Sequence, residues 1–292
     1  MVLNGKQAEQ LLQRAVQRVG RRGITARAPR LWKRAYPAFL HRIGICHTWS
    51  ASTFWGGRFE VVLPEPVSTQ VWRYGFFDDD VCLFLVRSLR PGMTFVDIGA
   101  HFGFFSLLAS ALVGSDGHIV ALEPMPETFR HLARNAAMHS AHDNITTVRW
   151  AAYSARTTLS FHDYGLVNSA LNSAFEARCV NRLRLRRDVA VDARTCDDMV
   201  REFALSQVDL IKIDAESAEM EVLRGAEQTI KRFRPRIILE VGDFDIAGTA
   251  SSSELVRSVL ALGYRAYERS HGDVIPHERR AIYEYGNLLF LP

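Results

Sequence analysis

The stretch Phe95-Val96-Asp97-Ile98-Gly99-Ala100-His101-Phe102-Gly103 decides the fold of this chain. It begins as an apolar, partly β-branched strand and passes through a glycine-containing turn into an apolar helix that ends before Gly114. Gly99 permits a tight turn or a positive φ, and Gly103 removes a Cβ where a ligand must approach the helix. The unpaired amides of the first helical turn carry a partial positive charge. The stretch therefore predicts a loop that holds an anionic or polar ligand.

A second run, Ile119-Val120-Ala121-Leu122-Glu123-Pro124, places a carboxylate at the end of another short strand. A carboxylate at that position suits ribose hydroxyls. A dinucleotide fingerprint would carry glycine where His101 stands, so diphosphate binding is disfavoured. Asp97 suits the ammonium of an amino acid moiety better than a phosphate, which favours S-adenosylmethionine. The alternative from this motif alone is a strand-to-helix turn of some other α/β protein.

Strand-like and helix-like segments alternate along the rest of the chain. This alternation predicts a Rossmann-like α/β fold with a mostly parallel, seven-stranded sheet, helices on both faces and an antiparallel last strand inserted between others. The expected strands are 94–98, 118–123, 146–151, 208–213, 236–241, 264–267 and 287–291. The expected helices are 102–113, 127–139, 217–233 and 252–262.

Four separated blocks together resemble the FkbM family of S-adenosylmethionine-dependent methyltransferases. They are residues 97–103, 122–124, 210–219 and 223–226, so the resemblance covers about residues 60 to 245. It implies a class I methyltransferase fold and a preference for oxygen acceptors. Two departures stand out: family members more often have Asn where His101 stands, and usually glycine where Ser217 stands. We expect Ser217 to cap the following helix, and His101 either to stabilise the turn or to reach the cofactor or the acceptor hydroxyl.

The fold assigns cofactor roles to residues at the ends of the first three strands. Glu123 is expected to bind the ribose hydroxyls, and Asp97 with the loop from Gly99 to Gly103 to bind the methionine end. The remaining predicted cofactor residues are Ala100 and His101 in that loop, Pro124 beside the acid, and Met125, Trp150 and Ala151, of which the last three flank the adenine. An apolar side chain at these positions is equally compatible with the core.

The acceptor is expected at the ends of the later strands. Methyl transfer to a hydroxyl needs in-line positioning and removal of a proton, and the predicted base is Asp214, with His101 second and His162 third. Glu216, Glu240, Asn168 and Asn172 are predicted to contact the acceptor, and a run of arginines (Arg178, Arg182, Arg184, Arg186 and Arg187) would suit a phosphate or carboxylate on it. The alternatives are acids that cap a helix, a turn-rich excursion with a solvated basic face, or a divalent cation held by Asp214, Glu240 and Asp243.

Charge and aromatic content divide the chain into an N-terminal extension (1–45), an aromatic-rich cap or entry region (46–92) and a catalytic domain (93–292). The extension holds ten Lys or Arg against Glu9 alone, while the rest holds 26 basic and 31 acidic residues. Its first helix places Leu12 and Val16 on one side and Arg14 and Arg18 on another. Peripheral membrane contact through this helix and a solvated basic face packed on the domain are both open. Nucleic-acid binding is disfavoured, since no basic, aromatic-interleaved patch continues into the domain.

The four cysteines form no C-x-x-C pair, and the N-terminus has no apolar signal-peptide core. We therefore expect a reduced, cytoplasmic protein. The predicted activity is transfer of a methyl group from S-adenosylmethionine to a hydroxyl of a sugar, glycolipid or other secondary metabolite. The acceptor is a small molecule, sugar or lipid-linked compound. The alternatives are an N-methyltransferase, a non-catalytic S-adenosylmethionine-binding module, and a nicotinamide-dependent oxidoreductase.

Overall fold

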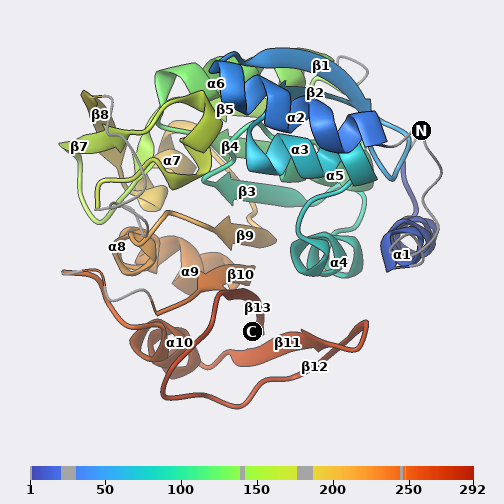
Figure 1. The fold of residues 1–292 in the computed structure, drawn as a ribbon. Helices are drawn as coiled ribbons and strands as arrows, with labels where there is room; N and C mark the ends of the chain where they lie inside the picture. The colour runs from blue at the N-terminus through green and yellow to red at the C-terminus, as the bar shows by residue number, and fades with distance from the viewer. Residues whose placement is uncertain (1, 21–30, 139–141, 176–186, 244–245, 247) are drawn as a thin grey trace.

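The computed structural model describes residues 2–20, 31–138, 142–175, 187–243, 246 and 248–292. Its main sheet has eight strands, and the five in the run from β10 to β5 are parallel (Figure 1). In spatial order the strands are β12 (Asp273–Pro276), β11 (Arg265–Ser270), β13 (Gly286–Leu291), β10 (Arg236–Val241), β9 (Leu210–Ile213), β3 (Thr94–Ile98), β4 (His118–Leu122) and β5 (Ile145–Val148).

The α/β fold class is confirmed, including the antiparallel strand β13 between β10 and β11. The expected strand count of seven is wrong, because β12 adds an eighth strand at the edge. Three of its four residues are exposed, so it lacks the apolar pattern that marks a strand in sequence. The third strand also ends earlier than expected. Ala151–Ala152 belongs to a separate short strand, β6, in another sheet.

Two layers of helices cover the sheet. Alternate residues of β3 enter two different hydrophobic clusters, Phe95 on one face and Val96 and Ile98 on the other. The first face is covered by α4 (Asp79–Ser88), α5 (Phe104–Val113) and α6 (Pro126–Met138), and the second by α7 (Cys196–Glu202), α8 (Glu219–Gly225), α9 (Glu227–Phe233) and α10 (Ser252–Ala261).

The single helix expected over 217–233 is wrong, because α8 and α9 are separated at Ala226. Gly225 lies so close to the neighbouring chain that an added Cβ would sit 1.9 Å from the carbonyl oxygen of Tyr153. Close approach of two backbones therefore accompanies the break.

A smaller sheet carries the excursion between β5 and β9. It contains β6, β8 (Arg187–Arg194) and β7 (Thr157–Asp163), followed along the chain by the 3-10 helix η3 (Leu166–Leu171) after β7. This excursion also contains the run of arginines noted in the sequence. Four of its five arginines, Arg178 to Arg186, lie outside the described residues.

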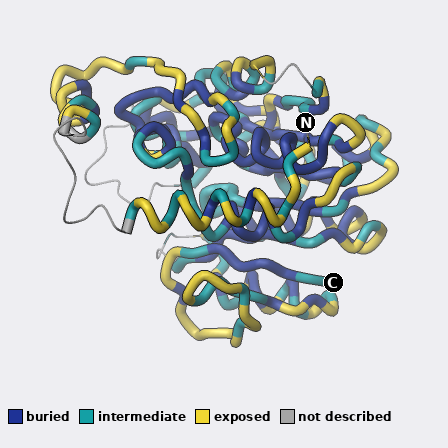
Figure 2. Tube along the Cα trace, turned by 90° about the vertical axis from the view of Figure 1, so that its right-hand side faces the viewer, coloured by how far each residue is buried: buried dark blue, intermediate teal, exposed yellow. Residues whose placement is uncertain are grey.

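Residues before β3 form helices α1 (Gly5–Gly20) and α2 (Leu31–Ile43), the hairpin β1 (His47–Ser52) and β2 (Arg58–Leu63), and helix α3 (Pro66–Tyr74). Helix α1 lies on α4, with Ala8 and Leu12 buried in the core cluster. Figure 2 shows α1 crossing the side that faces the viewer, with exposed stretches along its length. The sequence missed α3, because Pro66 resembled a break and instead opens the helix behind the N-cap Glu65. Among the described residues, no helix combines the length and apolar character needed to cross a membrane.

Candidate cofactor and acceptor site

A cavity lies at the carboxyl ends of β3, β4, β9 and β10, where open parallel sheets bind their ligands. Eleven residues that the sequence singled out line it: Gly99, Ala100, His101, Glu123, Pro124, Trp150, Ala151, Asn172, Asp214, Glu216 and Glu240. The structure thus brings one wall from the expected cofactor side together with another from the expected acceptor side.

Gly99 has a positive φ of 72° and packs directly against the chain that follows β9. A Cβ at this position would lie 1.8 Å from the carbonyl oxygen of Asp214. The glycine is therefore required by both conformation and close approach. Its effect is to hold the loop after β3 against the loop after β9, so the two walls of the cavity meet here.

Glu123 is 6% exposed and accepts one backbone hydrogen bond on each carboxylate oxygen. The amide of His101 donates to Oε2 at 3.1 Å, and the amide of Met125 donates to Oε1 at 3.0 Å. Burial raises the pKa of Glu123 to about 7, against the lowering effect of these two hydrogen bonds. Each oxygen keeps a second acceptor position, so the group can receive two more donors from a ligand in the cavity.

His101 forms part of the cavity wall and has a positive φ of 52°. Its Nε2 lies 2.8 Å from the hydroxyl of Ser169, and its ring lies 3.9 Å from the ring of Phe102. Burial lowers the pKa of His101 to about 3. The imidazole is therefore neutral at ordinary pH, and it links the loop after β3 to η3.

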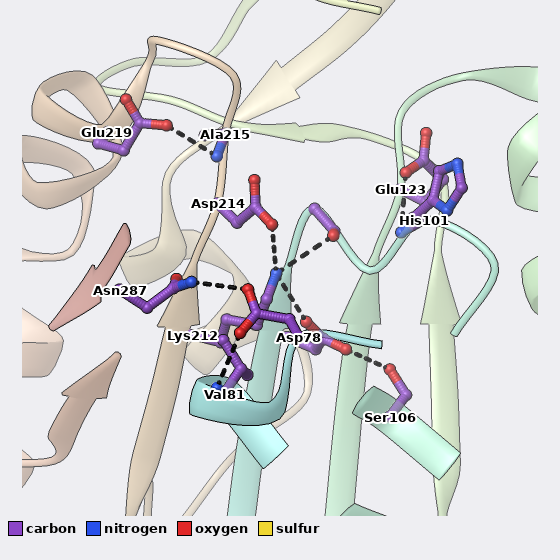
Figure 3. Close-up of polar contacts among 12 residues, drawn as sticks. Asp78, Val81, His101, Ser106, Glu123, Lys212, Asp214, Ala215, Glu219 and Asn287 are labelled. Atoms are coloured by element: carbon purple, nitrogen blue, oxygen red, sulfur yellow. Dashed lines mark hydrogen bonds and ion pairs between the residues drawn. The ribbon is translucent and has the colours of Figure 1, made fainter. Parts of the chain in front are cut away.

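Lys212 is buried at the wall of the cavity and is the centre of a network of charged groups (Figure 3). Its ammonium lies 3.0 Å from Asp214 Oδ2 and 3.6 Å from Asp97 Oδ1, and it donates to the Gly99 carbonyl at 3.5 Å. Burial alone would lower the pKa of Lys212, but the two carboxylates outweigh it and raise the pKa. The sequence reasoning gave Lys212 no role, although a lysine within the apolar run Leu210-Ile211-Lys212-Ile213 was the available signal.

Four predicted site residues do not line the cavity. Asp97 is fully buried behind it, where Ser106 Oγ donates to its Oδ2 at 2.6 Å. Gly103 opens α5 with φ of 88°, and an added Cβ there would lie 2.7 Å from a methyl of Leu132 on α6, so helix packing explains this glycine. Met125 belongs to an apolar cluster with Ala151 and Phe161. Asn168 lies on η3 and contacts the Tyr164 carbonyl.

His162, the third candidate base, lies outside the cavity as well. Its Nδ1 lies 2.8 Å from a carboxylate oxygen of Asp188 on the neighbouring strand of the small sheet. The pair occupies the strand-strand contact between β7 and β8, and His162 is not part of the cavity lining, although its neighbour Phe161 is.

Asp214, Glu216 and Glu240 each offer a carboxylate oxygen within 4.8 Å of the others. Asp243, the third acid of the expected cation site, is engaged elsewhere: it accepts hydrogen bonds from the amides of Ser252 and Tyr283 at 2.7 and 2.8 Å. The predicted set of Asp214, Glu240 and Asp243 is therefore not the cluster that forms. Lys212 supplies positive charge to the actual cluster through Asp214.

The turn before α8 contains consecutive positive φ angles, 48° at Glu216 and 83° at Ser217. The expectation that Ser217 caps the helix is wrong, because α8 begins after Ala218 without a side-chain cap. The carboxylate of Glu219 instead accepts hydrogen bonds from the amides of Ala215 and Ser217, at 3.0 and 3.2 Å. Ser217 thus occupies a conformation that favours glycine.

Aromatic side chains complete the cavity. Phe59 and Phe77 come from the aromatic-rich cap or entry region before β3, and Phe102, Phe104 and Phe105 follow the glycine loop. Tyr285, which precedes β13, also lines the cavity and was not foreseen. It lies in a loop without periodic pattern, so the sequence offered no signal for it.

The strand order, the inserted antiparallel strand, the glycine loop after β3 and the acid at the end of β4 are those of the class I methyltransferase fold. A model of the FkbM methyltransferase domain matches residues 97–266, which is more than half of the chain. The chain belongs to the FkbM methyltransferase family.

Individual relatives are distant. The chain is 28% identical over 166 residues to methyltransferase sdnD of Sordaria araneosa, covering 49% of this chain and 64% of that protein. It is 27% identical over 178 residues to 31-O-demethyl-FK506 methyltransferase FkbM of Streptomyces tacrolimicus, with coverages of 54% and 68%. The crystal structure of methyltransferase FkbM from Methylobacillus flagellatus aligns with a TM-score of 0.45 and 15% identity, over 78% of this chain and 56% of that one. The chain thus spans less than two thirds of the first and third of these proteins.

Proposed function

We propose that this protein transfers the methyl group of S-adenosylmethionine to a hydroxyl of a sugar, glycolipid or other secondary metabolite. The observation that carries the proposal is Glu123. It is a buried carboxylate at the end of the strand after the glycine loop, and both of its oxygens are fixed by backbone amides while they keep acceptor capacity toward the cavity.

The residues of the cavity fit this cofactor. A ribose diol presents two adjacent donors, which matches the two oxygens of Glu123. Pro124, Trp150 and Ala151 offer an apolar wall for a flat base beside it, and the Gly99–Ala100 backbone borders the remaining part of the cavity. When bound, the cofactor supplies an electrophilic methyl on a sulfonium. The protein then has to orient the acceptor and receive one proton.

Asp214 is the proposed base. It lines the cavity, it is held by Lys212 at 3.0 Å, and its side chain is 30% exposed, so an acceptor can reach it. His101 is a weaker candidate because its pKa of about 3 makes it a poor proton acceptor. Glu216, Glu240 and Asn172 are proposed to bind the acceptor from the same wall.

The names of two relatives support an oxygen acceptor. One is 31-O-demethyl-FK506 methyltransferase FkbM, and another is hexuronic acid methyltransferase AglP of Haloferax volcanii, 21% identical over 198 residues that cover 66% of this chain and 77% of that protein. Dependence on a divalent metal and a cytoplasmic location stay predictions. Activity before and after treatment with EDTA tests the first of these.

Thermal stability tests the cofactor. We would measure the melting temperature with S-adenosylmethionine, S-adenosylhomocysteine and NAD for the wild type, for Glu123→Ala and for the control Glu127→Ala on the surface of α6. A ligand at about 100 times its Kd adds roughly 2.7 kcal/mol to the free energy of unfolding. Stabilisation by the first two that Glu123→Ala loses and Glu127→Ala keeps supports the proposal. Stabilisation by NAD alone would indicate an oxidoreductase.

Turnover tests the chemistry. Purified protein is incubated with labelled S-adenosylmethionine and panels of hydroxyl and amine acceptors, and the labelled product is identified. We expect Asp214→Asn to lower kcat by about 100-fold or more while the affinity for S-adenosylhomocysteine stays within about threefold. The control Glu221→Gln, on the outer face of α8, should match the wild type. Methylation of amines alone contradicts the proposed acceptor, and binding without turnover on any acceptor indicates a binding module.

A further inference from the structure

The outer face of α2 and the adjoining start of β1 expose an unusual concentration of large apolar side chains. Trp32, Phe39 and Ile43 on α2 are 48%, 56% and 46% exposed, and Ile45 and Trp49 beyond it are 52% and 45% exposed. We call these five residues the α2 patch. Half of the exposed large hydrophobic residues in the described part of the chain therefore fall within 18 consecutive positions. Single exposed apolar residues are ordinary, but five large ones within so short a segment indicate a candidate binding surface.

The α2 patch is distinct from the residues by which α2 packs on the protein. Pro37 and Leu40, on the other side of α2, are already buried. Two contacts hold the patch in place: the Tyr36 hydroxyl lies 2.5 Å from His47 Nδ1, and the rings of Trp32 and Trp72 meet edge to face at 5.0 Å. The helix thus has one face packed on the protein and a second apolar face turned to solvent.

The charged residues that flank this patch in the sequence are cationic. Residues 10–59 contain no Asp or Glu, and Glu9 is paired with Arg87 at 2.8 Å. A groove beside the patch is lined by Trp32 and Trp49 together with Arg14 and Arg18 from α1. Among the described residues, Arg14 and Arg18 are exposed and form no ion pair. The surface therefore combines apolar and aromatic groups with unneutralised positive charge.

We propose that the α2 patch, with Arg14 and Arg18, binds the surface of an anionic lipid bilayer. Tryptophan is favoured at the boundary between headgroups and acyl chains, aliphatic side chains insert below it, and cations bind anionic headgroups. The combination of all three matches an anionic bilayer, which offers an apolar interior and a negatively charged surface to the same face of a protein.

This location differs from the one that the sequence suggested, which was the first helix. Helix α1 packs its apolar residues Ala8 and Leu12 on α4, so it has no free apolar face to insert. Its arginines still face the groove and contribute charge. In Figure 1, α2 and β1 lie at the top of the molecule, at the β5 end of the sheet and away from β11 and β12.

The hairpin of β1 and β2 and the helix α3 connect the α2 patch to the cavity. Strand β1 pairs with β2, where Ala51 is opposite Phe59, and Phe59 lines the cavity. On helix α3, Val67 lines the cavity and Trp72 packs against Trp32 of the α2 patch. If the proposed methyl transfer holds, an extension that rests on that function follows: the acceptor is lipid-linked and is taken from the bilayer.

Vesicle sedimentation with the full chain tests the membrane proposal without reference to catalysis. Vesicles of phosphatidylcholine alone are compared with vesicles that contain 30% phosphatidylserine at physiological salt. We expect binding to the anionic vesicles at least tenfold stronger than to the neutral ones. Equal binding to both, or no binding to either, overturns the proposal, whatever the outcome of the methyltransferase assays.

Matched variants locate the contact. Phe39→Ser/Ile43→Ser should lower the partition onto anionic vesicles at least tenfold, whereas Ile275→Ser/Ile282→Ser, at exposed isoleucines elsewhere, should not. Arg14→Gln/Arg18→Gln should also lower the partition onto anionic vesicles at least tenfold, since each cation contributes about fivefold. The control Lys231→Gln/Arg257→Gln should leave the partition unchanged. Unchanged melting temperatures show that the variants fold. If the patch variant instead converts a dimer to a monomer in sedimentation velocity and leaves vesicle binding intact, the patch is a contact between copies and the proposal is wrong.

Tryptophan fluorescence tests the same contact in the wild-type protein. Brominated lipids quench tryptophans that enter the bilayer, so wild-type emission should fall on anionic brominated vesicles. The quenched part should disappear in Trp32→Phe/Trp49→Phe, which keeps aromatic rings at both positions. Quenching that persists in this variant would place another part of the molecule in the bilayer and would contradict the proposal.

Discussion

The two walls of the cavity are built differently. The wall at the ends of β3 and β4 is held by backbone hydrogen bonds to Glu123 and by the neutral ring of His101. The wall at the ends of β9 and β10 groups three acids, Asp214, Glu216 and Glu240, around a turn with two positive φ angles. The first wall has one buried acid that is held by backbone amides, and the second concentrates charge around a strained turn. This difference suits a shared cofactor on one side and a variable acceptor on the other.

Only a few residues join the walls. Gly99 permits the loop after β3 to touch the carbonyl of Asp214, and Lys212 lies between Asp214 and Asp97, which is buried on β3 behind the cavity. If the two walls are built in these different ways, changes at the junctions should damage the whole site, whereas changes within one wall should affect one property at a time.

The largest effect is expected from Gly99→Ala. The new Cβ would lie 1.8 Å from the Asp214 carbonyl oxygen, at a φ of 72° that alanine adopts poorly. Backbone must move at the junction, so we expect a loss of about 3 kcal/mol or more in the free energy of unfolding, measured by urea denaturation.

Gly92→Ala separates the two causes. Gly92 has a φ of 81°, but nothing lies within 4 Å of the position of an added Cβ. Only the conformational cost remains, about 1 kcal/mol. Equal losses in the two alanine variants would show that the junction at Gly99 contributes no steric constraint.

Lys212→Met should cause the next largest loss in the free energy of unfolding. The change leaves the buried Asp97 without its cation, because Oδ1 of this carboxylate has no hydrogen-bond partner in the described structure. Breaking a buried pair from one side costs about 3 kcal/mol. Denaturation should also show that Asp97→Asn/Lys212→Met is more stable than Lys212→Met, since the double variant removes the uncompensated charge.

Lys231→Met is the matched control for this change. Lys231 pairs with Glu227 on the surface of α9, and its side chain is 62% exposed. Solvent screens such a pair, so little change in stability is expected. A loss for Lys212→Met no larger than this control would mean that the network does not hold the walls together.

The cavity residues that the sequence predicted lie in both walls, and the ones that it missed depend on long-range contacts. Gly99, His101 and Glu123 belong to short strand-turn-helix units whose pattern is local. Lys212 acts through residues more than a hundred positions away, and Tyr285 and Phe59 reach the cavity only because the sheet and the hairpin fold beside it. The assignment of Asp243 as a cation ligand is wrong because its carboxylate accepts hydrogen bonds from Ser252 and Tyr283, which the fold brings to it. The cap at Ser217 is wrong for a local reason, because its φ is positive and α8 begins only after Ala218.

A change in pH should act on the first wall through Glu123. Burial raises the pKa of Glu123 to about 7, so the folded protein holds a proton there that the unfolded chain releases near pH 4. The contribution of this group to stability is present below the unfolded pKa and is lost as pH rises through about 7. The ionised form accepts ribose hydroxyls better, so the Kd for S-adenosylhomocysteine should fall about tenfold between pH 6 and 8. Calorimetric titration measures it.

Glu123→Gln should remove this pH dependence of binding. Glu65→Gln should not, although the pKa of Glu65 is also raised by burial to about 7, because Glu65 caps α3 and does not line the cavity. Lys212 and Asp214 are the charged neighbours of Glu123, and they are unchanged in both variants. Binding that is independent of pH in the wild type would contradict the role of Glu123.

The smallest effect, and the one that tests the second wall, is expected from Ser217→Gly. Serine is strained at a φ of 83°, so glycine should raise the free energy of unfolding by up to about 1 kcal/mol. Ser206→Gly, at an exposed bend without positive φ, should lower it by a few tenths because glycine gains freedom in the unfolded chain. If the relaxed turn also weakens methyl transfer while S-adenosylhomocysteine binding stays constant, the strain at Ser217 positions Asp214 and Glu216 toward the acceptor. If both variants lose stability alike, the turn is not strained, and the contrast between the two walls rests on charge alone.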